Sequence, residues 1–490
     1  MRILFLNPQG NFDPNDLYWT EHPDFGGQLV YVKELALAMS ELGHDVDIIT
    51  RRFSDETYPG FEKPIDAYPG YPKCRIVRIP AGKDGFIPKE HLWEVLHEWV
   101  DGIIDFYHDA DVTVDFITTH YGDGGIAGAM LSQKWKVPFS FTGHSLGAQK
   151  MDKLSLSLDT LDSLNDKYQF AKRLMAERTT IEGASLIFTS TPQERDEQYY
   201  HPAYRDLTET KPDAFVVSPP GVNEKVFGAD VRNDTEQATY QALDQALVRD
   251  IASDRLDLPY IVLASRLDQK KNHIGVLEAY AESVTLQAMS NIAISIRGID
   301  DVFTSYDALK PDEKILMDAM MDVINAHNLR GKVTFVNITS QQGLASAYRY
   351  FAALKSVFAL TSTYEPFGLA PIEAMCAGLP AAVTQYGGPA DVLKDDAGTY
   401  GVLLDVMNRD HIIKGLMQIF KHYTYYQTQG MQRVKDAYTW KATAKRYIQA
   451  IEGVLEEGIY PTFTVPDYFL SPSDFLDFHT QPITDYYMHH

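Results

Sequence analysis

The chain has 490 residues, of which 45% are hydrophobic and 23% charged, and its formal net charge is −23. A chain of this length is too long for one hydrophobic core, so we expect two or three domains. The acidic excess disfavours nucleic acid and anionic membrane surfaces as partners, because both are bound by basic surfaces.

The cysteine content and the hydropathy of the sequence indicate the cellular compartment of the protein. Its two cysteines, Cys74 and Cys376, stand far apart and in no metal-binding spacing, which favours a reducing setting. The apolar part of the opening stretch MRILFLNPQG is shorter than the hydrophobic region of a signal peptide. No apolar run reaches the roughly 18 residues that a spanning helix needs. We therefore expect a soluble cytoplasmic protein whose partners are small molecules, without nucleic acid or membrane.

Short apolar runs typical of strands alternate with longer helical patterns along the whole chain. In the first half these runs lie at residues 2–7, 44–50, 74–80, 115–120, 138–143, 185–190 and 214–220. In the second half they lie at residues 259–265, 292–298, 332–337, 356–362, 380–385 and 401–405. Alternating strands and helices predict parallel sheets covered on both faces, so the expected fold class is α/β with two doubly wound Rossmann-like domains.

The domain boundary is predicted at Pro219, Pro220 and Gly221, which end a strand and break regular structure. The predicted domains are therefore 1–220 and 221–438. Residues 439–490 read as a final helix and an extended tail, which we expect to cross back to the N-terminal domain. Ligands of open α/β sheets bind at the carboxyl ends of the strands, so we expect the site in a deep cleft between the domains.

The segment HPDFGGQLVYVKELALAM, residues 22–39, places a glycine pair in front of an amphipathic helix that begins at about Gln28. Strand, glycine-bearing loop and helix together direct backbone N–H groups at an anion. The loop from Asn7 to Gly26 is far longer than a dinucleotide fingerprint allows, and no compact G-x-G-x-x-G follows a strand. This pattern argues against a dinucleotide-dependent dehydrogenase.

The most specific stretch is TYEPFGLAPIEAMCAGLP, residues 363–380, with Glu365 and Glu373 eight positions apart. A glycosidase acid–base pair is one interpretation, since a loop could bring the two carboxylates closer than a helix would. A simpler one is that each carboxylate accepts hydrogen bonds from sugar hydroxyls. The N–H groups of Phe367, Gly368 and Leu369, at a helix start, would then point to a phosphate or a sugar edge.

A basic stretch, ASRLDQKKN at residues 264–272, follows the strand PYIVL directly. Arg266 and Lys271 leave the strand at the edge where ligands bind. Two fixed cations suit a departing diphosphate, because negative charge builds on the leaving oxygen in the transition state. Lys270 is better explained as a solvated surface charge.

Four stretches together resemble the retaining glycosyltransferases with two Rossmann-like domains, the glycosyltransferase-B architecture: FGGQLVYVKE, TGHSLGAQK, SRLDQKKN and EPFGLAPIE. The sequence is most similar to the sucrose-phosphate synthase family, over roughly residues 1–455. In that family UDP-glucose and fructose 6-phosphate give sucrose 6-phosphate and UDP.

The resemblance implies a role for each candidate residue of the donor site. Gly27 would offer its N–H to the donor phosphate, and His144 would contact the glucosyl group near its 6-hydroxyl. Glu365 and the backbone of 367–369 would hold the glucose hydroxyls, while Glu373 would hold the ribose. Arg266 and Lys271 would take up the charge of the leaving UDP.

The resemblance also implies an acceptor site in the first domain. Gly26 and Gln28 would face the acceptor sugar. The remaining candidates, expected to converge on fructose 6-phosphate, are Lys89, Tyr121, Ser145, Lys150 and Arg173. Lys150 and Arg173 are expected at the phosphate and Lys89 at the sugar, so the first two would distinguish this family from sucrose synthase, which uses free fructose.

Several alternatives stay open at this point. GHSLG at 143–147 matches G-x-S-x-G, so an α/β-hydrolase with Ser145 as nucleophile is a rival, although the terminal His489 and His490 are poor partners for it. A transferase using another donor such as GDP-mannose, sucrose synthase, and a non-catalytic sugar-nucleotide sensor are the others. Contacts to the base are expected mostly from backbone, around 297–298 and 337–338.

Metal use is not expected. Two D-x-D strings occur, at Asp45–Asp47 and Asp109–Asp111, but the first lies in a strand pattern and the second in a loop. Arg266 and Lys271 would supply the charge that a divalent ion brings elsewhere, so we expect no metal and no cofactor beyond the nucleotide sugar itself.

Overall fold

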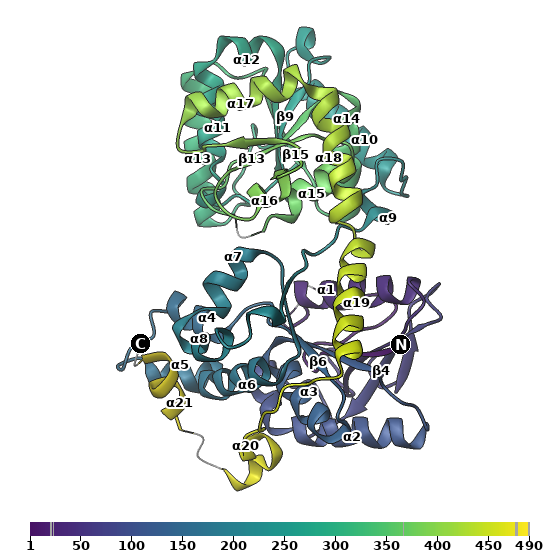
Figure 1. Cartoon of the computed structure of the whole chain (residues 1–490). Coiled ribbons are helices and arrows are strands. Elements are labelled where there is room, and N and C mark those ends of the chain that lie inside the picture. The colour runs from purple at the N-terminus through teal and green to yellow at the C-terminus, as the bar shows by residue number, and fades with distance from the viewer. Residues whose placement is uncertain (20–21, 23, 366, 476–478, 489–490) are drawn as a thin grey trace. The chain divides into compact units, whose positions relative to one another are not determined.

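The structure is a computed structural model, and it describes residues 1–19, 22, 24–365, 367–475 and 479–488. The chain divides into two compact units (Figure 1). The first unit is formed by Met1–Pro220 with Trp440–His490, and the second by Gly221–Thr439.

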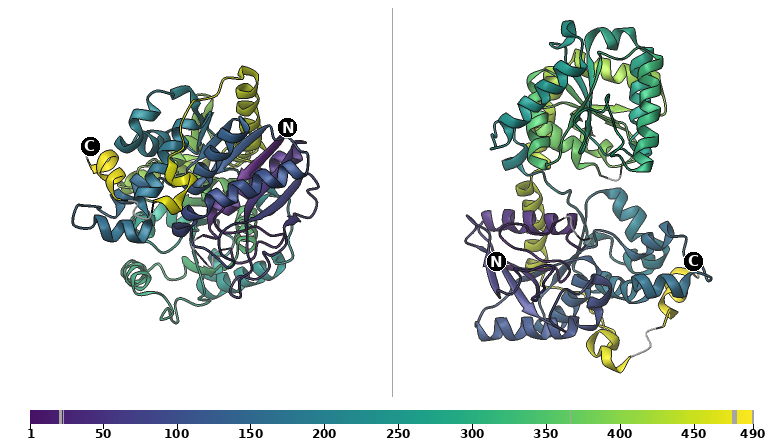
Figure 2. Two further views of the ribbon diagram at one scale, coloured as in Figure 1. Left: turned by 90° about the horizontal axis from the view of Figure 1, so that it is seen from below. Right: turned by 180° about the vertical axis from the view of Figure 1, so that it is seen from behind.

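An eight-stranded sheet lies at the centre of the first unit (Figure 2). In spatial order its strands are β3 (Ile65–Ala67), β4 (Cys74–Pro80), β2 (Asp45–Arg52), β1 (Arg2–Leu6), β5 (Phe116–His120), β6 (Phe139–Thr142), β7 (Leu186–Thr189) and β8 (Phe215–Val217). Neighbours pair in parallel except β3, which runs antiparallel to β4. The carboxyl ends of the seven parallel strands therefore meet at one edge.

Helices cover both faces of this sheet, and the alternation along β1 shows which face each residue serves. Ile3 and Phe5 pack in the cluster with α1 and α19, whereas Leu4 and Leu6 pack on the other face with α2, α3 and α6. The helices of this unit include α1 (Gly27–Glu41), α2 (Leu96–Asp109), α3 (Tyr121–Trp135), α4 (Gly147–Lys153), α5 (Leu161–Tyr168), α6 (Phe170–Gly183), α7 (Pro192–Glu194), α8 (Pro202–Thr208), α19 (Trp440–Glu457) and the 3-10 helix η1 (Lys89–Glu94).

The second unit contains a six-stranded parallel sheet with the order β11 (Val333–Asn337), β10 (Asn291–Ile296), β9 (Tyr260–Leu263), β12 (Val357–Leu360), β13 (Ala381–Thr384) and β16 (Val402–Leu404). A small hairpin, β14 (Lys394–Asp395) and β15 (Gly398–Thr399), precedes β16. Side chains of β9 again divide between two core clusters, with Val262 on one face and Ile261 on the other.

Its helices likewise lie on both faces. One cluster contains residues of α9 (Glu224–Phe227), α10 (Glu236–Asp250), α14 (Gln341–Ala353), α15 (Leu369–Cys376), α16 (Pro389–Leu393) and α18 (Tyr423–Ala437). The other contains residues of α11 (His273–Glu282), α12 (Val284–Met289), α13 (Pro311–Ala326) and α17 (Arg409–Lys421). The predicted fold class, α/β with two Rossmann-like domains, is confirmed.

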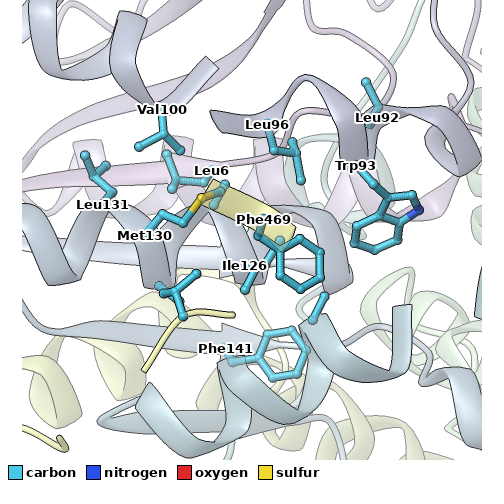
Figure 3. Close-up of a cluster of buried hydrophobic side chains, with 14 of the residues drawn as sticks. Leu6, Leu92, Trp93, Leu96, Val100, Ile126, Met130, Leu131, Phe141 and Phe469 are labelled. Atoms are coloured by element: carbon cyan, nitrogen blue, oxygen red, sulfur yellow. The ribbon is translucent and has the colours of Figure 1, made fainter. Parts of the chain in front are cut away.

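The C-terminal tail differs from the extended segment that the sequence predicts. It forms α20 (Asp467–Leu470), α21 (Gln481–Ile483) and a π-helical turn, η7 (Thr484–Met488). Val465, Phe469 and Ile483 are buried against the first unit, and Figure 3 shows Phe469 beside Ile126 and Trp93. These apolar side chains are too widely spaced to give a helical period, so the sequence pattern does not reveal the burial.

Within the described ranges, every helix is too short or too polar to traverse a bilayer.

Candidate functional site

Three non-glycine residues adopt a left-handed backbone conformation close after central strands. Tyr121 (φ 65°) follows β5, His144 (φ 57°) follows β6 by two residues, and Asn272 (φ 54°) lies in the loop after β9. This conformation costs non-glycine residues about 1–3 kcal/mol, and such strain gathers at functional sites. In both units it marks the strand ends where the sequence predicts ligand binding.

In the second unit, Lys271 and Glu365 form an ion pair. The Lys271 Nζ lies 2.5 Å from Glu365 Oε2, and both side chains are largely withdrawn from solvent. Ser362 donates to the same carboxylate oxygen at 3.1 Å. The candidate cation after β9 and the candidate sugar-binding carboxylate are thus brought together from positions 94 residues apart.

The backbone of Glu365 is fixed by the loop that follows β13. Its N–H donates to Tyr386 O at 3.1 Å, and its carbonyl accepts from Gly388 N at 3.0 Å. A Cβ on Gly387 would lie 2.1 Å from the Glu365 carbonyl oxygen, so only glycine permits this approach. The Glu365 side chain therefore projects from a rigid support.

Arg266 differs from Lys271. Its side chain is exposed, and no hydrogen bond or ion pair joins its guanidinium to any residue of the described ranges. In the same loop, Ser265 Oγ lies 3.0 Å from His273 Nε2, and burial lowers the pKa of that histidine to about 4. The loop is anchored by a neutral imidazole, and Arg266 stands free for an anionic ligand.

The helix expected after the E-P-F-G stretch begins at Leu369, with Gly368 (φ 78°) as its N-cap residue and no side-chain cap. The first N–H groups of α15 are consequently left without a cap from a side chain. The rings of Phe367 and Tyr438 pack together, with their centroids 6.4 Å apart. Pro366 lies outside the described residues.

Glu373 stands on α15, and its carboxylate has no hydrogen-bond partner among the residues that the structure describes. Burial raises its pKa to about 7, from an ordinary value of 4.5. A withdrawn carboxyl group without a partner can accept hydroxyl donors from a ligand.

Around the predicted base contacts, Gly298 N donates to Asn337 Oδ1 at 2.8 Å.

In the first unit, Gly26 is the extended N-cap residue of α1 and Gly27 its first residue. A Cβ on Gly27 would meet no atom of the protein within 4 Å, and its φ is not positive. Nothing in the chain itself therefore demands glycine at this exposed position. Two hydrogen bonds hold the side-chain amide of Gln28. Its Nε2 donates to Asn7 Oδ1 at 2.5 Å, and its Oε1 accepts from Gln9 Nε2 at 2.6 Å.

His144 is paired with a second histidine. Its Nε2 lies 3.0 Å from Nδ1 of His120, and the two rings stack with centroids 5.2 Å apart. Burial lowers the pKa of His144 to about 3, and burial together with His144 lowers that of His120 as well. Both imidazoles are neutral, so one proton is shared along the contact and His120 fixes the orientation of His144.

Lys89 is held by a buried acid. Asp24, which is 2% exposed, accepts from Lys89 Nζ at 2.5 Å and from the Lys89 backbone N–H at 2.9 Å. Asp123 lies fully buried nearby, and burial is the main cause that raises its pKa to about 7.

Arg173 is likewise held by a buried acid. Its Nε donates to Glu177 Oε1 at 2.8 Å, and its Nη2 donates to the carbonyl oxygen and the hydroxyl of Ser145 at 2.7 and 3.2 Å. The guanidinium also lies over the ring of Tyr121, 4.4 Å from its centroid. Three acceptor candidates, Arg173, Ser145 and Tyr121, are thus in direct contact.

Lys150 stands on α4, with its Nζ 3.9 Å from the ring centroid of Tyr168. Burial lowers its pKa, and the neighbouring positive charges of Arg173, Lys89 and Lys167 lower it further, against the opposing effect of Glu90. Lys150 is therefore near enough to Arg173 and Lys89 to be repelled by both.

Three residues that hold the candidate side chains escape the sequence analysis: Asp24, His120 and Glu177. Glu177 stands four residues after Arg173 on α6, a helical pairing distance that could have indicated it. Asp24 and His120 give no such signal, because their partners are 65 and 24 residues away.

The carboxylate of Asp47, from the first D-x-D string, is already bonded to side chains of the protein. It accepts from Arg75 Nε and Nη2 at 2.7 Å and from Arg2 Nη1 at 3.2 Å. Across the described ranges, no group of three or more histidine, cysteine, aspartate or glutamate residues is arranged to hold a metal ion. His489 and His490, weighed as hydrolase partners for Ser145, lie outside the described residues.

Family models match both units. The model described as "Glycosyl transferase 4-like domain" covers residues 26–203, and the model "Glycosyl transferases group 1" covers residues 248–433. These matches identify a glycosyltransferase and remove the support for the hydrolase and dehydrogenase alternatives.

Individual relatives indicate which glycosyltransferases the chain is similar to. A probable sucrose-phosphate synthase of Thermosipho melanesiensis is 42% identical over 94% of this chain and 99% of its own length. A mannosylfructose-phosphate synthase of Agrobacterium fabrum is 27% identical, with 93% of both chains covered. A sucrose-phosphate synthase of Zea mays is 29% identical, and the chain spans 47% of its length.

Solved structures agree on the fold. A sucrose-phosphate synthase from Thermosynechococcus elongatus superposes with a TM-score of 0.59 at 23% identity, covering 93% of this chain and 100% of that one. The catalytic domain of starch synthase IV from Arabidopsis thaliana reaches a TM-score of 0.55 at 13% identity, covering 93% and 99%. With the fold of a glycosyltransferase and a relative of 42% identity over nearly its whole length, the chain belongs to the sucrose-phosphate synthase family of glycosyltransferases.

Proposed function

We propose that the protein transfers glucose from UDP-glucose to fructose 6-phosphate, with retention of configuration, to give sucrose 6-phosphate and UDP. In this proposal most donor contacts come from the second unit, and the acceptor contacts come from the first. The free, buried thiols of Cys74 and Cys376 support a reducing, cytoplasmic setting.

The observation that carries the proposal is the group of cations in the first unit. Arg173, Lys150 and Lys89 stand close enough for their charges to lower the pKa of Lys150, in a chain whose net charge is −23. Mutual repulsion of this kind is relieved by a bound dianion. A phosphorylated acceptor supplies one, whereas free fructose does not.

On the donor side, Arg266 and Lys271 are proposed to stabilise the leaving diphosphate. The bond between the glucosyl carbon and the phosphate oxygen breaks, and its electron pair goes to UDP. The acceptor hydroxyl oxygen bonds to the same carbon from the same face, and its proton passes to the leaving phosphate oxygen. The two cations take the place of a metal ion in this proposal, because they place positive charge where negative charge develops.

His144 and the E-x7-E residues are proposed to position the glucosyl and ribose groups. A neutral imidazole with a pKa of about 3 suits a hydrogen bond to a sugar hydroxyl, not proton donation. Glu365, already paired with Lys271, and the unpartnered Glu373 would accept hydroxyl donors from glucose and ribose. The open space at Gly27 is consistent with a phosphate group that approaches the backbone there.

A second candidate is a mannosyl donor. The mannosylfructose-phosphate synthase relative covers 93% of the chain, and its name shares a phosphorylated product with the sucrose-phosphate synthases but not the transferred sugar. The acceptor phosphate is therefore better supported than the donor.

The test is a matrix of substrates with the full-length protein. Nucleoside diphosphate release is measured with UDP-glucose and GDP-mannose, each against fructose and fructose 6-phosphate. We expect turnover with UDP-glucose and fructose 6-phosphate and little with free fructose. Turnover with GDP-mannose alone would replace the donor, equal use of fructose would contradict the phosphate site, and no turnover with any pair would favour a sensor. Addition of a chelator should leave the rate unchanged.

A further inference from the structure

The C-terminal tail contacts the three elements that carry the acceptor cations. Lys89 stands on η1, Lys150 on α4 and Arg173 on α6. In the described part of the tail, α20 lies against α2 and α21 lies against α6 (Figures 1 and 2).

The first contact is at η1. Phe469 is fully buried and lies 6.3 Å, between ring centroids, from Trp93, four residues after Lys89. Figure 3 shows the Phe469 ring near the side chains of Trp93 and Ile126. The tail thus forms part of the core on which η1 rests.

The second contact is at α6. The guanidinium of Arg178 lies 3.8 Å from the ring centroid of Tyr486 and is also paired with Asp206 of α8. Arg178 and Arg173 stand on the same helix, so a tail residue covers one side of the helix whose other side carries the phosphate candidate.

The third contact is at the seven-residue helix α4. Tyr487 donates from its hydroxyl to Asp152 Oδ1 at 2.7 Å and stacks on His201, which lies 3.2 Å from the other Asp152 oxygen. Asp152 follows Lys150 by two residues, so the two side chains leave a helix on nearly opposite sides. The tail therefore contacts α4 on the side of the helix that faces away from Lys150.

Gly147, Ala148 and Met151 bury the inner face of α4, whereas the side that carries Asp152 is loosely packed. A cavity of about 650 Å³ remains among Asp152, Leu156, His201, Thr484 and Tyr487. A seven-residue helix is not stable by itself. Its position therefore depends on a few specific contacts, of which the Tyr487–Asp152 hydrogen bond is one.

We propose that the C-terminal tail is a positioning element of the acceptor site, and that Tyr487 sets the place of Lys150 by holding Asp152. Tyr487 and Phe469 touch no substrate in this proposal. It rests on the proposed function, because it assumes that Lys150 binds the acceptor phosphate.

The test uses full-length variants at the tail. Tyr487→Phe removes only the hydroxyl, and Tyr487→Ala also removes the ring. Phe463→Leu is the matched control, because Phe463 is a tail residue that packs far from Arg173. It lies at the C-terminal end of α6, where a Cβ on Gly183 would be 2.8 Å from the Phe463 ring. The Michaelis constants for fructose 6-phosphate and for the nucleotide sugar are measured separately, together with thermal stability and hydrogen exchange of residues 147–153.

We expect the Michaelis constant for fructose 6-phosphate to rise about threefold in Tyr487→Phe and about tenfold in Tyr487→Ala, as loss of one and then two contacts implies. The donor constant should change by less than about twofold. Residues 147–153 should exchange faster in both variants. Phe463→Leu should lower the melting temperature and leave both constants and this exchange unchanged.

The proposal is overturned by unchanged exchange of residues 147–153 in Tyr487→Ala, or by faster exchange with no change in the acceptor constant. Acceptor and donor constants that rise together, in the control as well, would show general destabilisation and overturn it too. If the unaltered protein does not use fructose 6-phosphate, the proposed function fails. The exchange measurement still decides independently whether the tail holds α4.

Discussion

The two units hold their candidate cations in different ways. In the first unit, Lys89 and Arg173 are each tied to a buried carboxylate, of Asp24 and Glu177, before any ligand binds. In the second unit, Lys271 pairs with a partly accessible glutamate, and Arg266 is exposed without a partner in the described part of the chain. Two candidate acceptor cations, Lys89 and Arg173, are thus held in place by the fold, whereas Arg266, a candidate donor cation, is available to a ligand that brings its own charge.

This difference separates stability from catalysis. A buried charge whose partner is removed costs several kcal/mol of folding free energy, because the remaining charge is left without compensation. An exposed charge without a partner costs folding almost nothing when it is removed. Substitutions in the first unit should therefore affect folding first, and substitutions at Arg266 should affect the reaction alone.

The largest effect is expected for Glu177→Gln. The Glu177 carboxylate accepts from Arg173 Nε, from the Tyr204 hydroxyl and from Gly147 N at 2.9 Å, and its side chain is fully buried. Neutralising it should lower the free energy of unfolding by about 3 kcal/mol or more. Denaturant unfolding measures the loss. Glu182→Gln, an exposed residue of the same helix, should be nearly neutral, and an equal loss there would contradict preorganisation.

Next in size is Arg266→Ala. If this side chain stabilises the leaving diphosphate, kcat should fall about a hundredfold, while donor affinity falls far less. Because the side chain is exposed, the melting temperature should not change. Lys270→Ala, four residues on and also exposed, is the control and should retain activity. Equal losses in kcat and donor binding at Arg266 would contradict the leaving-group role.

A smaller effect is expected from Glu373, through pH. Burial raises the pKa of this carboxyl to about 7 in the folded protein, above its ordinary 4.5. The folded state then binds more protons than the unfolded state between these values, so stability falls as pH rises from about 4.5 to 7 and is flat above. Glu373→Gln should remove this dependence and gain about 1–2 kcal/mol at pH 8 relative to pH 4.5, after allowance for partial exposure.

Unfolding of both proteins at the two pH values measures the difference. A gain of the same size at both would show that Glu373 is ionised normally in the folded state. Weaker nucleotide binding by the same variant would support its ribose contact.

The strands were predictable because buried parallel strands are continuous apolar runs: each run from 2–7 to 401–405 overlaps a strand of the structure. The three-residue strand Ile65–Ala67 was missed because an exposed edge strand carries no such run. The candidate cations could be found from motifs, but Asp24 and His120 could not, because tertiary contact alone gives them their roles. The return of residues 439–490 to the first domain was predicted and agrees with the division of the chain, but the short helices and buried aromatic residues of the tail were not, because those residues are isolated and give no periodicity.

The smallest effect concerns the pair of histidines in the first unit. His120→Phe keeps a ring against Phe5, whose centroid lies 5.6 Å away, and removes the hydrogen bond to His144. Loss of one such bond should lower kcat by about five- to tenfold. His120→Asn places an amide near the former Nδ1 and should recover part of the rate.

The same pair predicts how activity depends on pH. Because burial lowers the pKa of His144 to about 3, the imidazole is neutral at every pH above about 4, and kcat/KM should show no step from its ionisation between pH 5 and 8. Nitrogen chemical shifts of the His144 ring should likewise stay constant over this range, and should change in His120→Phe as the tautomer is freed. A titration of His144 near pH 6.5 would mean that the ring is solvated and not held by His120, and the sugar contact proposed for a fixed neutral imidazole would then lose its support.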